Sequence, residues 1–284
     1  MLGSLLKYDF RALNKIMLPL QLGVLAAGII GTICFNIFYR AMTSYNTYYS
    51  TTSSMIEGFT EVMAMLGAIT LFSLVYLSGF ITLLLIARNA YKSFYSSEGY
   101  LTFTLPVSMD KHIISKSISG LSWSLINALI IIASTVFLLV FGFAHEGLIS
   151  FQLIETIGRE LADSFLPPMG IFYLIEIIFI GLVSLLYNVL QIIFSIVLGG
   201  ALARTHKVLA AIGIYLLSSM AMGFISSVFS LIVSMGAYAM SSSYSSIMLE
   251  SQPLLIVTLI VTLGFSVGFY FLSRVSLKKN LNLD

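Results

Sequence analysis

The stretch VLAAIGIYLLSSMAMGFISSVFSLIVSMGAYAMSSSYSSIML, from Val208 to Leu249, contains 42 residues without a charged side chain. As one α-helix it would be about 63 Å long, twice the thickness of the hydrocarbon core of a bilayer. Two complete crossings would leave almost no residues for a turn. The stretch therefore predicts one membrane span over 208–230 and a re-entrant or surface-lying segment over 224–251. Three places suit a bend: Gly223, Gly236 and the SSSYSS run at 241–246.

Five other apolar runs each exceed the ~20 residues that a helix needs to cross a bilayer. They predict spans over 17–39, 62–87, 117–143, 177–203 and 253–273. The composition agrees, with 58% hydrophobic and 9% charged residues and a mean hydropathy of +1.01. A soluble fold of this composition would have too little polar surface to cover itself. The sequence therefore predicts an all-α, polytopic membrane protein with six transmembrane helices.

The cations are distributed unevenly among the loops that six spans would create. Of the 14 Lys and Arg residues, 12 fall on one side, and only Arg40 and Arg159 fall on the other. Cytoplasmic loops of membrane proteins carry an excess of Lys and Arg. We therefore expect a cell-membrane protein with its N- and C-termini in the cytoplasm. A second complete crossing within 208–249 would move Arg274, Lys278 and Lys279 outside, so the charge pattern favours the re-entrant segment.

The N-terminal residues 1–16 have an amphipathic pattern. Apolar side chains recur at helical spacing and lie opposite Lys7, Arg11 and Lys15. This pattern is typical of a helix that lies in the membrane interface, with its cations near anionic lipid headgroups. The alternative is that these residues extend the first span into the cytoplasm.

The sequence lacks several kinds of enzyme site. It contains no Gly-Lys dipeptide, and therefore no P-loop to hold the phosphates of ATP, and no H-E-x-x-H motif. Its three histidines, His112, His145 and His206, fall in different predicted loops, which does not favour a shared metal site. We expect no catalytic residues and no metal ligands. The net charge of +2 reflects which loops face the cytoplasm, and we expect no nucleic-acid partner.

The cytoplasmic loop predicted at 88–116 is unusually apolar. It contains the run SEGYLTFTLPVSMDKH at 97–112, in which Pro106 ends one short element and Ser108 or Asp110 can cap the next. An apolar loop should not be exposed to water, so it packs against membrane-proximal helices or binds a partner protein. The pattern leaves both interpretations open and favours the partner.

A polar stripe runs along the span predicted at 177–203. Its members that could line a translocation path are Glu176, Tyr187, Asn188 and Gln191. In lipid such a stripe faces either another helix or a water-filled path, and the spacing fits both. Gln21, Asn36 and Asn127, in other spans, are interpreted as contacts between packed helices.

The run Glu98-Gly99-Tyr100-Leu101-Thr102-Phe103-Thr104-Leu105-Pro106-Val107 is similar to one in permeases of Gram-positive bacteria. Together with the N-terminal helix, the six spans and the re-entrant segment, it makes the chain resemble ABC-2 type permeases, the membrane subunits of ATP-binding-cassette exporters. The resemblance implies a second permease, identical or related, and two ATPase subunits that bind ATP and Mg²⁺. It assigns the contact with the ATPase to Glu98, Gly99, Tyr100, Leu101, Phe103, Leu105, Pro106 and Asp110.

Two other classes of protein fit the sequence less well. A self-contained secondary transporter or channel usually has buried titratable groups near the bilayer midplane and internal repeats. Here only Glu176 lies within an apolar run, and residues 1–140 do not resemble residues 141–284. A membrane sensor or scaffold without transport activity is the other alternative. The sequence does not indicate a cargo.

Overall fold

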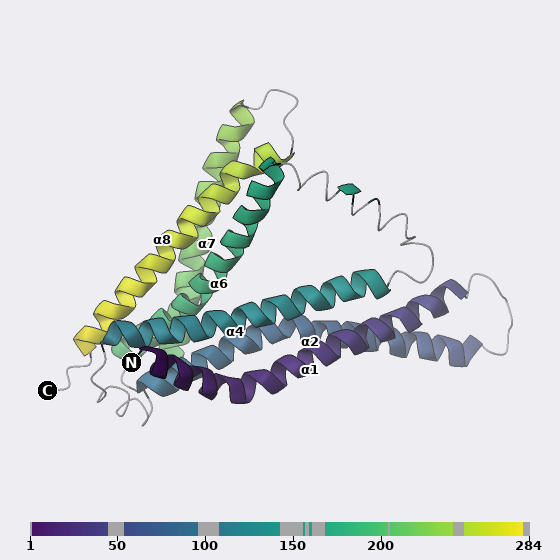
Figure 1. Ribbon diagram of the computed structural model, residues 1–284, viewed down its shortest axis with the longest axis horizontal. Helices are drawn as coiled ribbons and strands as arrows, with labels where there is room; N and C mark the ends of the chain where they lie inside the picture. The colour runs from purple at the N-terminus through teal and green to yellow at the C-terminus, as the bar shows by residue number, and fades with distance from the viewer. Residues whose placement is uncertain are drawn as a thin grey trace. The chain divides into compact units, whose positions relative to one another are not determined.

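A computed structural model describes residues 2–44, 54–95, 108–142, 156, 159–160, 168–203, 205–240 and 247–280. Within these residues the secondary structure is helical, with no β-strand (Figure 1). The long helices are α1 (Leu2–Ser44), α2 (Ser54–Tyr95), α4 (Met109–Phe137), α6 (Pro168–Leu202), α7 (Lys207–Met240) and α8 (Ile247–Asn280). A five-residue π-helix, η1 (Leu138–Gly142), continues α4.

Six helices of the described part of the chain are long and apolar enough to cross a membrane. All six expose large apolar side chains along their length, as lipid contact requires. For the described residues, the predictions of an all-helical structure and of six helices that can span a membrane are confirmed, which supports a multi-pass membrane protein.

The chain forms two compact units, and helices α1, α2 and α4 contribute residues to both. Unit 1 consists of Met1–Leu13, Leu83–Ser122 and Phe165–Asp284. Unit 2 consists of Asn14–Thr82 and Trp123–Ser164.

Helix α6 is the centre of unit 1, with α7 and α8 packed against it (Figure 1). Every residue of α6 from 189 to 197 is buried. The rings of Tyr187 and Phe194 lie 5.7 and 4.8 Å, between centroids, from the ring of Phe269 on α8. On the α7 side, the backbone of Gly199 approaches the backbone of Ala211 so closely that a Cβ on Gly199 would lie 2.5 Å from the Ala211 nitrogen. Glycine therefore permits the tight contact between α6 and α7.

Unit 2 is built from α1, α2 and the second part of α4. Two glycines of α1 allow its backbone to approach the other helices. A Cβ on Gly28 would lie 2.5 Å from the Ser134 hydroxyl of α4, and a Cβ on Gly31 would lie 3.1 Å from the Leu71 Cβ of α2. Small residues at such contacts are the usual means of helix association in lipid.

The N-terminal segment differs from its prediction. Residues 2–16 are not a separate interfacial helix but the first part of α1, which continues through Pro19 to Ser44. The face that was expected to enter the lipid is partly covered by protein, since Leu13 and Met17 are 4% and 0% exposed. The alternative, an extension of the first span, describes these residues better, because protein contacts hold the segment in line with the helix.

The segment at 224–251, which was predicted to be re-entrant or to lie on the surface, is helical in its described residues. Helix α7 runs without interruption through Gly223 and Gly236 to Met240, and α8 already begins at Ile247. The predicted bends at the two glycines are therefore wrong. A continuous helix satisfies every backbone group within the segment, which lipid demands, whereas a glycine only permits a bend. The SSSYSS run at 241–246 lies outside the described residues.

The predicted cytoplasmic loop at 88–116 is shorter than expected. Helix α2 continues to Tyr95, and α4 begins at Met109 after Ser108, whose carbonyl accepts a hydrogen bond from the Lys111 backbone at 3.0 Å. The charged residues at the two ends of the predicted loop therefore lie on α2 and on α4. Charge marks the level at which a helix leaves the hydrocarbon, and it does not mark where the helix ends.

Candidate functional site

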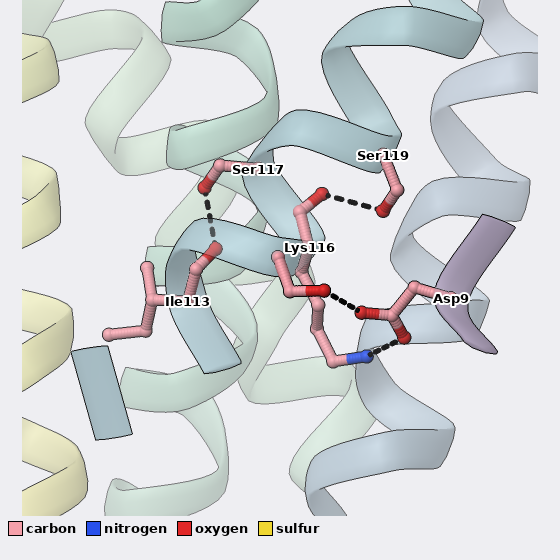
Figure 2. A network of polar contacts seen from close by, with 6 residues as sticks. Asp9, Ile113, Lys116, Ser117 and Ser119 are labelled. Carbon is pink, nitrogen blue, oxygen red and sulfur yellow. Dashed lines mark hydrogen bonds and ion pairs between the residues drawn. The ribbon is translucent and has the colours of Figure 1, made fainter. Parts of the chain in front are cut away.

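A buried ion pair joins the beginnings of α1 and α4 within unit 1 (Figure 2). The Asp9 carboxylate accepts a hydrogen bond from the Ser115 hydroxyl at 2.7 Å through Oδ2 and one from Lys116 Nζ at 3.0 Å through Oδ1. The three residues are 8%, 0% and 5% exposed. Because Ser115 and Lys116 are consecutive on α4, both reach the same carboxylate. We call Asp9, Ser115 and Lys116 the α4 anchor.

Helix α2 completes the surroundings of the α4 anchor. Lys116 Nζ lies 5.6 Å from the centroid of the Phe94 ring, within the range of a cation–π interaction. A buried ammonium group needs such partners, since its transfer from water costs several kcal/mol without them. The neighbouring hydroxyls are satisfied locally, because Ser117 donates to the Ile113 carbonyl at 2.8 Å and Ser119 to the Lys116 carbonyl at 3.1 Å (Figure 2).

A second polar contact ties the first turn of α4 to α8. Asp110 Oδ1 pairs with Arg274 Nε at 2.8 Å and accepts a hydrogen bond from the Tyr270 hydroxyl at 3.3 Å. Both partners of the ion pair are about one-third exposed, so the pair is weaker than the α4 anchor. Asp110 was predicted to belong to the ATPase-coupling loop. The structure places it on a helix, at the first turn after that loop.

Tyr95, the last residue of α2, is anchored to α6 and α7. Its hydroxyl donates a hydrogen bond to the Val197 carbonyl of α6 at 2.8 Å. Its ring lies against Gly200, where any Cβ would collide with it, and Lys207 Nζ of α7 lies 5.1 Å from the ring centroid. The end of α2 is thereby fixed to the α6–α7 connection.

These contacts have one arrangement in common. Tyr95 ends α2 directly before the sequence 96–107, and Asp110 lies in the first turn of α4 after it. Each bonds to other helices of unit 1. The α4 anchor lies between one and two turns further along α4. A displacement applied to the ends of α2 and α4 would therefore be passed to α1, α6, α7 and α8.

Most residues of the predicted ATPase contact lie outside the described residues. They are Glu98, Gly99, Tyr100, Leu101, Phe103, Leu105 and Pro106. Their role remains a prediction from the sequence.

The predicted polar stripe of α6 is distributed between the interior and the surface of unit 1. Gln191 is 1% exposed, and its Nε2 lies 3.0 and 2.7 Å from the Ser218 and Ser219 hydroxyls of α7. Tyr187 is buried against Phe269, whereas Asn188 donates to the Ser184 carbonyl at 2.8 Å. Glu176 is half-buried. Tyr187 and Gln191 therefore have helix partners within one chain, and the assignment of the stripe to a translocation path stays a prediction.

Polar side chains also connect the helices of unit 2. Gln21 Nε2 donates to the Thr82 hydroxyl at 3.4 Å, and the Ser78 hydroxyl donates to Asn127 Oδ1 at 3.0 Å. Asn36 Nδ2 donates to the Phe141 carbonyl at 3.1 Å. The interpretation of Gln21, Asn36 and Asn127 as contacts between packed helices is confirmed.

Two further observations concern enzymatic chemistry. A G-x-S-x-G pattern occurs at Gly264–Gly268, but it lies inside α8, and the Ser266 hydroxyl donates to the Thr262 carbonyl of the preceding turn at 2.7 Å. A nucleophile elbow needs a sharp turn between a strand and a helix, which this segment does not provide. In the parts of the chain that the structure describes, no three His, Cys, Asp or Glu residues are placed to hold a metal ion.

Sequence reasoning missed the α4 anchor. A signal was present, because Asp9, Leu13 and Met17 recur at intervals of four residues and therefore share one helix face. An acid among apolar residues on one face indicates a buried partner, but the sequence does not say which cation supplies it.

No protein family, curated protein or solved structure matches this chain.

Proposed function

We propose that this chain is the permease subunit of an ATP-binding-cassette exporter in the cell membrane. The observation that carries the proposal is the apolar sequence 98–107, EGYLTFTLPV, which resembles a run in ABC-2 type permeases. It stands between two helix ends, Tyr95 and Asp110, that are bonded to the rest of unit 1. An apolar cytoplasmic sequence on a chain without a P-loop is accounted for by an ATPase partner that covers it.

The anchored helix ends give the coupling a physical basis. The ATPases bind ATP and Mg²⁺, and their closure moves the sequence 98–107. Because Tyr95 and Asp110 are bonded to α6 and α8, the movement is passed to these helices as well as to α2 and α4. A second permease, identical or related, completes the export path between the two subunits. Six spans with both termini in the cytoplasm place the sequence 98–107 on the ATPase side.

The first test of the coupling sequence is a charge placed in its apolar run. Leu101→Asp and Leu105→Asp should each abolish co-purification of the ATPase while the chain still inserts into the membrane, because a carboxylate would be buried in the contact. Ser97→Asp, which adds the same charge outside the apolar run, should retain the ATPase. Retention of the ATPase by both leucine variants would place the contact elsewhere.

The proposed topology can be tested by thiol labelling. Cys34 is the only cysteine of the chain, so Cys34→Ser gives a background without thiols. In that background, Ser242→Cys should react with a membrane-impermeant maleimide on intact cells, and Lys279→Cys should react only after permeabilisation. The reverse labelling pattern would invert the topology and remove the sequence 98–107 from the cytoplasm.

Co-purification of the ATPase also separates an exporter permease from the two alternatives, a secondary transporter or channel and a sensor or scaffold. Transport that depends on a proton or sodium gradient, by a chain purified without an ATPase, would identify a secondary transporter. A chain without an ATPase and without transport would identify a sensor or scaffold.

A further inference from the structure

Helix α1 begins and helix α8 ends at the same end of unit 1 (Figure 1). The described residues at this end carry an excess of exposed positive charge. Both acids described at this end, Asp9 and Asp110, are taken up by ion pairs with Lys116 and Arg274. Six cations stay exposed, and none of them forms an ion pair with another described residue: Lys7, Arg11, Arg88, Lys111, Lys278 and Lys279. Among the described residues, this end of unit 1 therefore carries more exposed positive than negative charge.

The α4 anchor determines which way two of these cations point. Successive residues of an α-helix are turned by about 100°, so Lys7 and Arg11, each two residues from Asp9, are turned about 200° away from it. Because Asp9 faces Ser115 and Lys116 in the interior, Lys7 and Arg11 face outward, and both are exposed. The buried ion pair thus holds a cationic face away from the protein.

The depth of the cations indicates what they contact. Arg88 lies seven residues before the end of α2, or about 10 Å along the axis, and Arg11 lies about 14 Å from the start of α1. Both lie inside helices that are apolar enough to cross a membrane, Val62–Tyr95 and Leu2–Phe38. These helices have 34 and 37 residues and are therefore about 50–55 Å long, so each end of a helix centred in the ~30 Å hydrocarbon core extends about 10 Å or more beyond it. Cations some 10 Å from the helix end then lie near the level of the lipid headgroups.

Apolar side chains that could hold an acyl chain adjoin these cations. Leu84, 52% exposed, lies one turn before Arg88 on the same face of α2, and Tyr8, 68% exposed, is next to Lys7 on α1. A lipid lying on α2 would have its acyl chain on Leu84 and its phosphate at Arg88. Tyrosine is likewise enriched at the membrane–water interface.

We propose that Lys7, Arg11 and Arg88 bind the phosphate headgroups of anionic phospholipids in the membrane leaflet at this end of unit 1. A lipid fits better than an acidic protein, because these cations lie on the spanning helices and next to exposed apolar side chains. The inference does not depend on the proposed export function, since it concerns only unit 1 and the membrane.

Native mass spectrometry of the purified chain tests the proposal. The protein is titrated in mild detergent with phosphatidylglycerol or phosphatidylcholine of the same acyl composition. We expect a preference for phosphatidylglycerol, and the triple variant Lys7→Gln, Arg11→Gln, Arg88→Gln should lose it. Each surface cation contributes about a fivefold change in affinity, so the triple variant should bind phosphatidylglycerol about a hundredfold more weakly.

A charge-conserving triple variant, Lys7→Arg, Arg11→Lys, Arg88→Lys, serves as the control and should keep the preference. Glycerophosphoglycerol, which has the headgroup without acyl chains, should not displace the lipid at millimolar concentration.

Equal binding of the two lipids by the native chain, or an unchanged preference in the glutamine variant, would overturn the proposal. If the triple glutamine variant does not fold, Arg88→Gln alone should show the fivefold loss. Binding of an acidic protein to these cations without any lipid preference would assign the surface to a protein partner instead.

Discussion

Replacing one member of the buried ion pair, by Asp9→Asn or Lys116→Met, is expected to destabilise the protein by about 3–5 kcal/mol. Each change leaves the opposite charge without its counter-ion in a site where both side chains are buried. Asp9→Asn removes the counter-ion of Lys116, and Lys116→Met removes the counter-ion of Asp9, while the Phe94 ring and the Ser115 hydroxyl stay in place. Ser115→Ala removes one hydrogen bond to a charged group and should cost less, about 1.5–3 kcal/mol.

Thermal unfolding of the purified variants in one detergent measures these effects. The double variant Asp9→Asn, Lys116→Met leaves no buried charge and should be more stable than either single variant. Lys15→Gln, at an exposed position on the same helix, is the matched control and should leave the midpoint unchanged. Additive losses in the double variant would show that the two side chains do not interact.

The second large effect is expected at the contact between α6 and α7, where Gly199→Val should destabilise unit 1 by about 3 kcal/mol or more. A Cβ at this position would lie 2.5 Å from the Ala211 nitrogen and 2.7 Å from its Cα. The obstacle is backbone, so no side-chain rotation can relieve it, and the two helices must separate. Separation would also disturb Tyr95, which bonds to Val197 two residues earlier on α6.

Helical glycines that face open space provide the controls for Gly199. A Cβ added at Gly181 on α6 or at Gly213 on α7 would meet no atom within 4 Å. Gly181→Ala and Gly213→Ala should leave stability unchanged or raise it slightly, because alanine has the better helix propensity. Comparable losses at all three positions, measured by thermal unfolding, would contradict the close contact at Gly199.

The six membrane-spanning helices of the described residues could be predicted from the sequence, because the length of an apolar run is a direct measure of a membrane crossing. Helix ends did not follow, since α2 continues seven residues past Arg88 to Tyr95, and α7 runs through two glycines. Charges and glycines mark the membrane boundary and possible bends. Hydrogen bonding of the backbone decides where a helix ends.

The partners within the site could not be predicted for a different reason. Asp9 is separated by more than 100 residues from Lys116, and Tyr95 by about as many from Val197. Contacts of this range depend on how three helices are rotated against one another, which a single sequence does not specify. Gln21, Asn36 and Asn127 were interpreted correctly because a polar amide in lipid requires a partner wherever it lies.

Co-purification of the native chain in mild detergent from the organism that encodes it, with bound proteins identified by mass spectrometry, shows whether the chain is the permease of an ATP-binding-cassette exporter. We expect an ATPase subunit with a P-loop in stoichiometric amount, which the Leu101→Asp and Leu105→Asp variants lose. A chain that purifies alone, or only with further copies of itself, under conditions that preserve membrane complexes would contradict the assignment as an exporter permease.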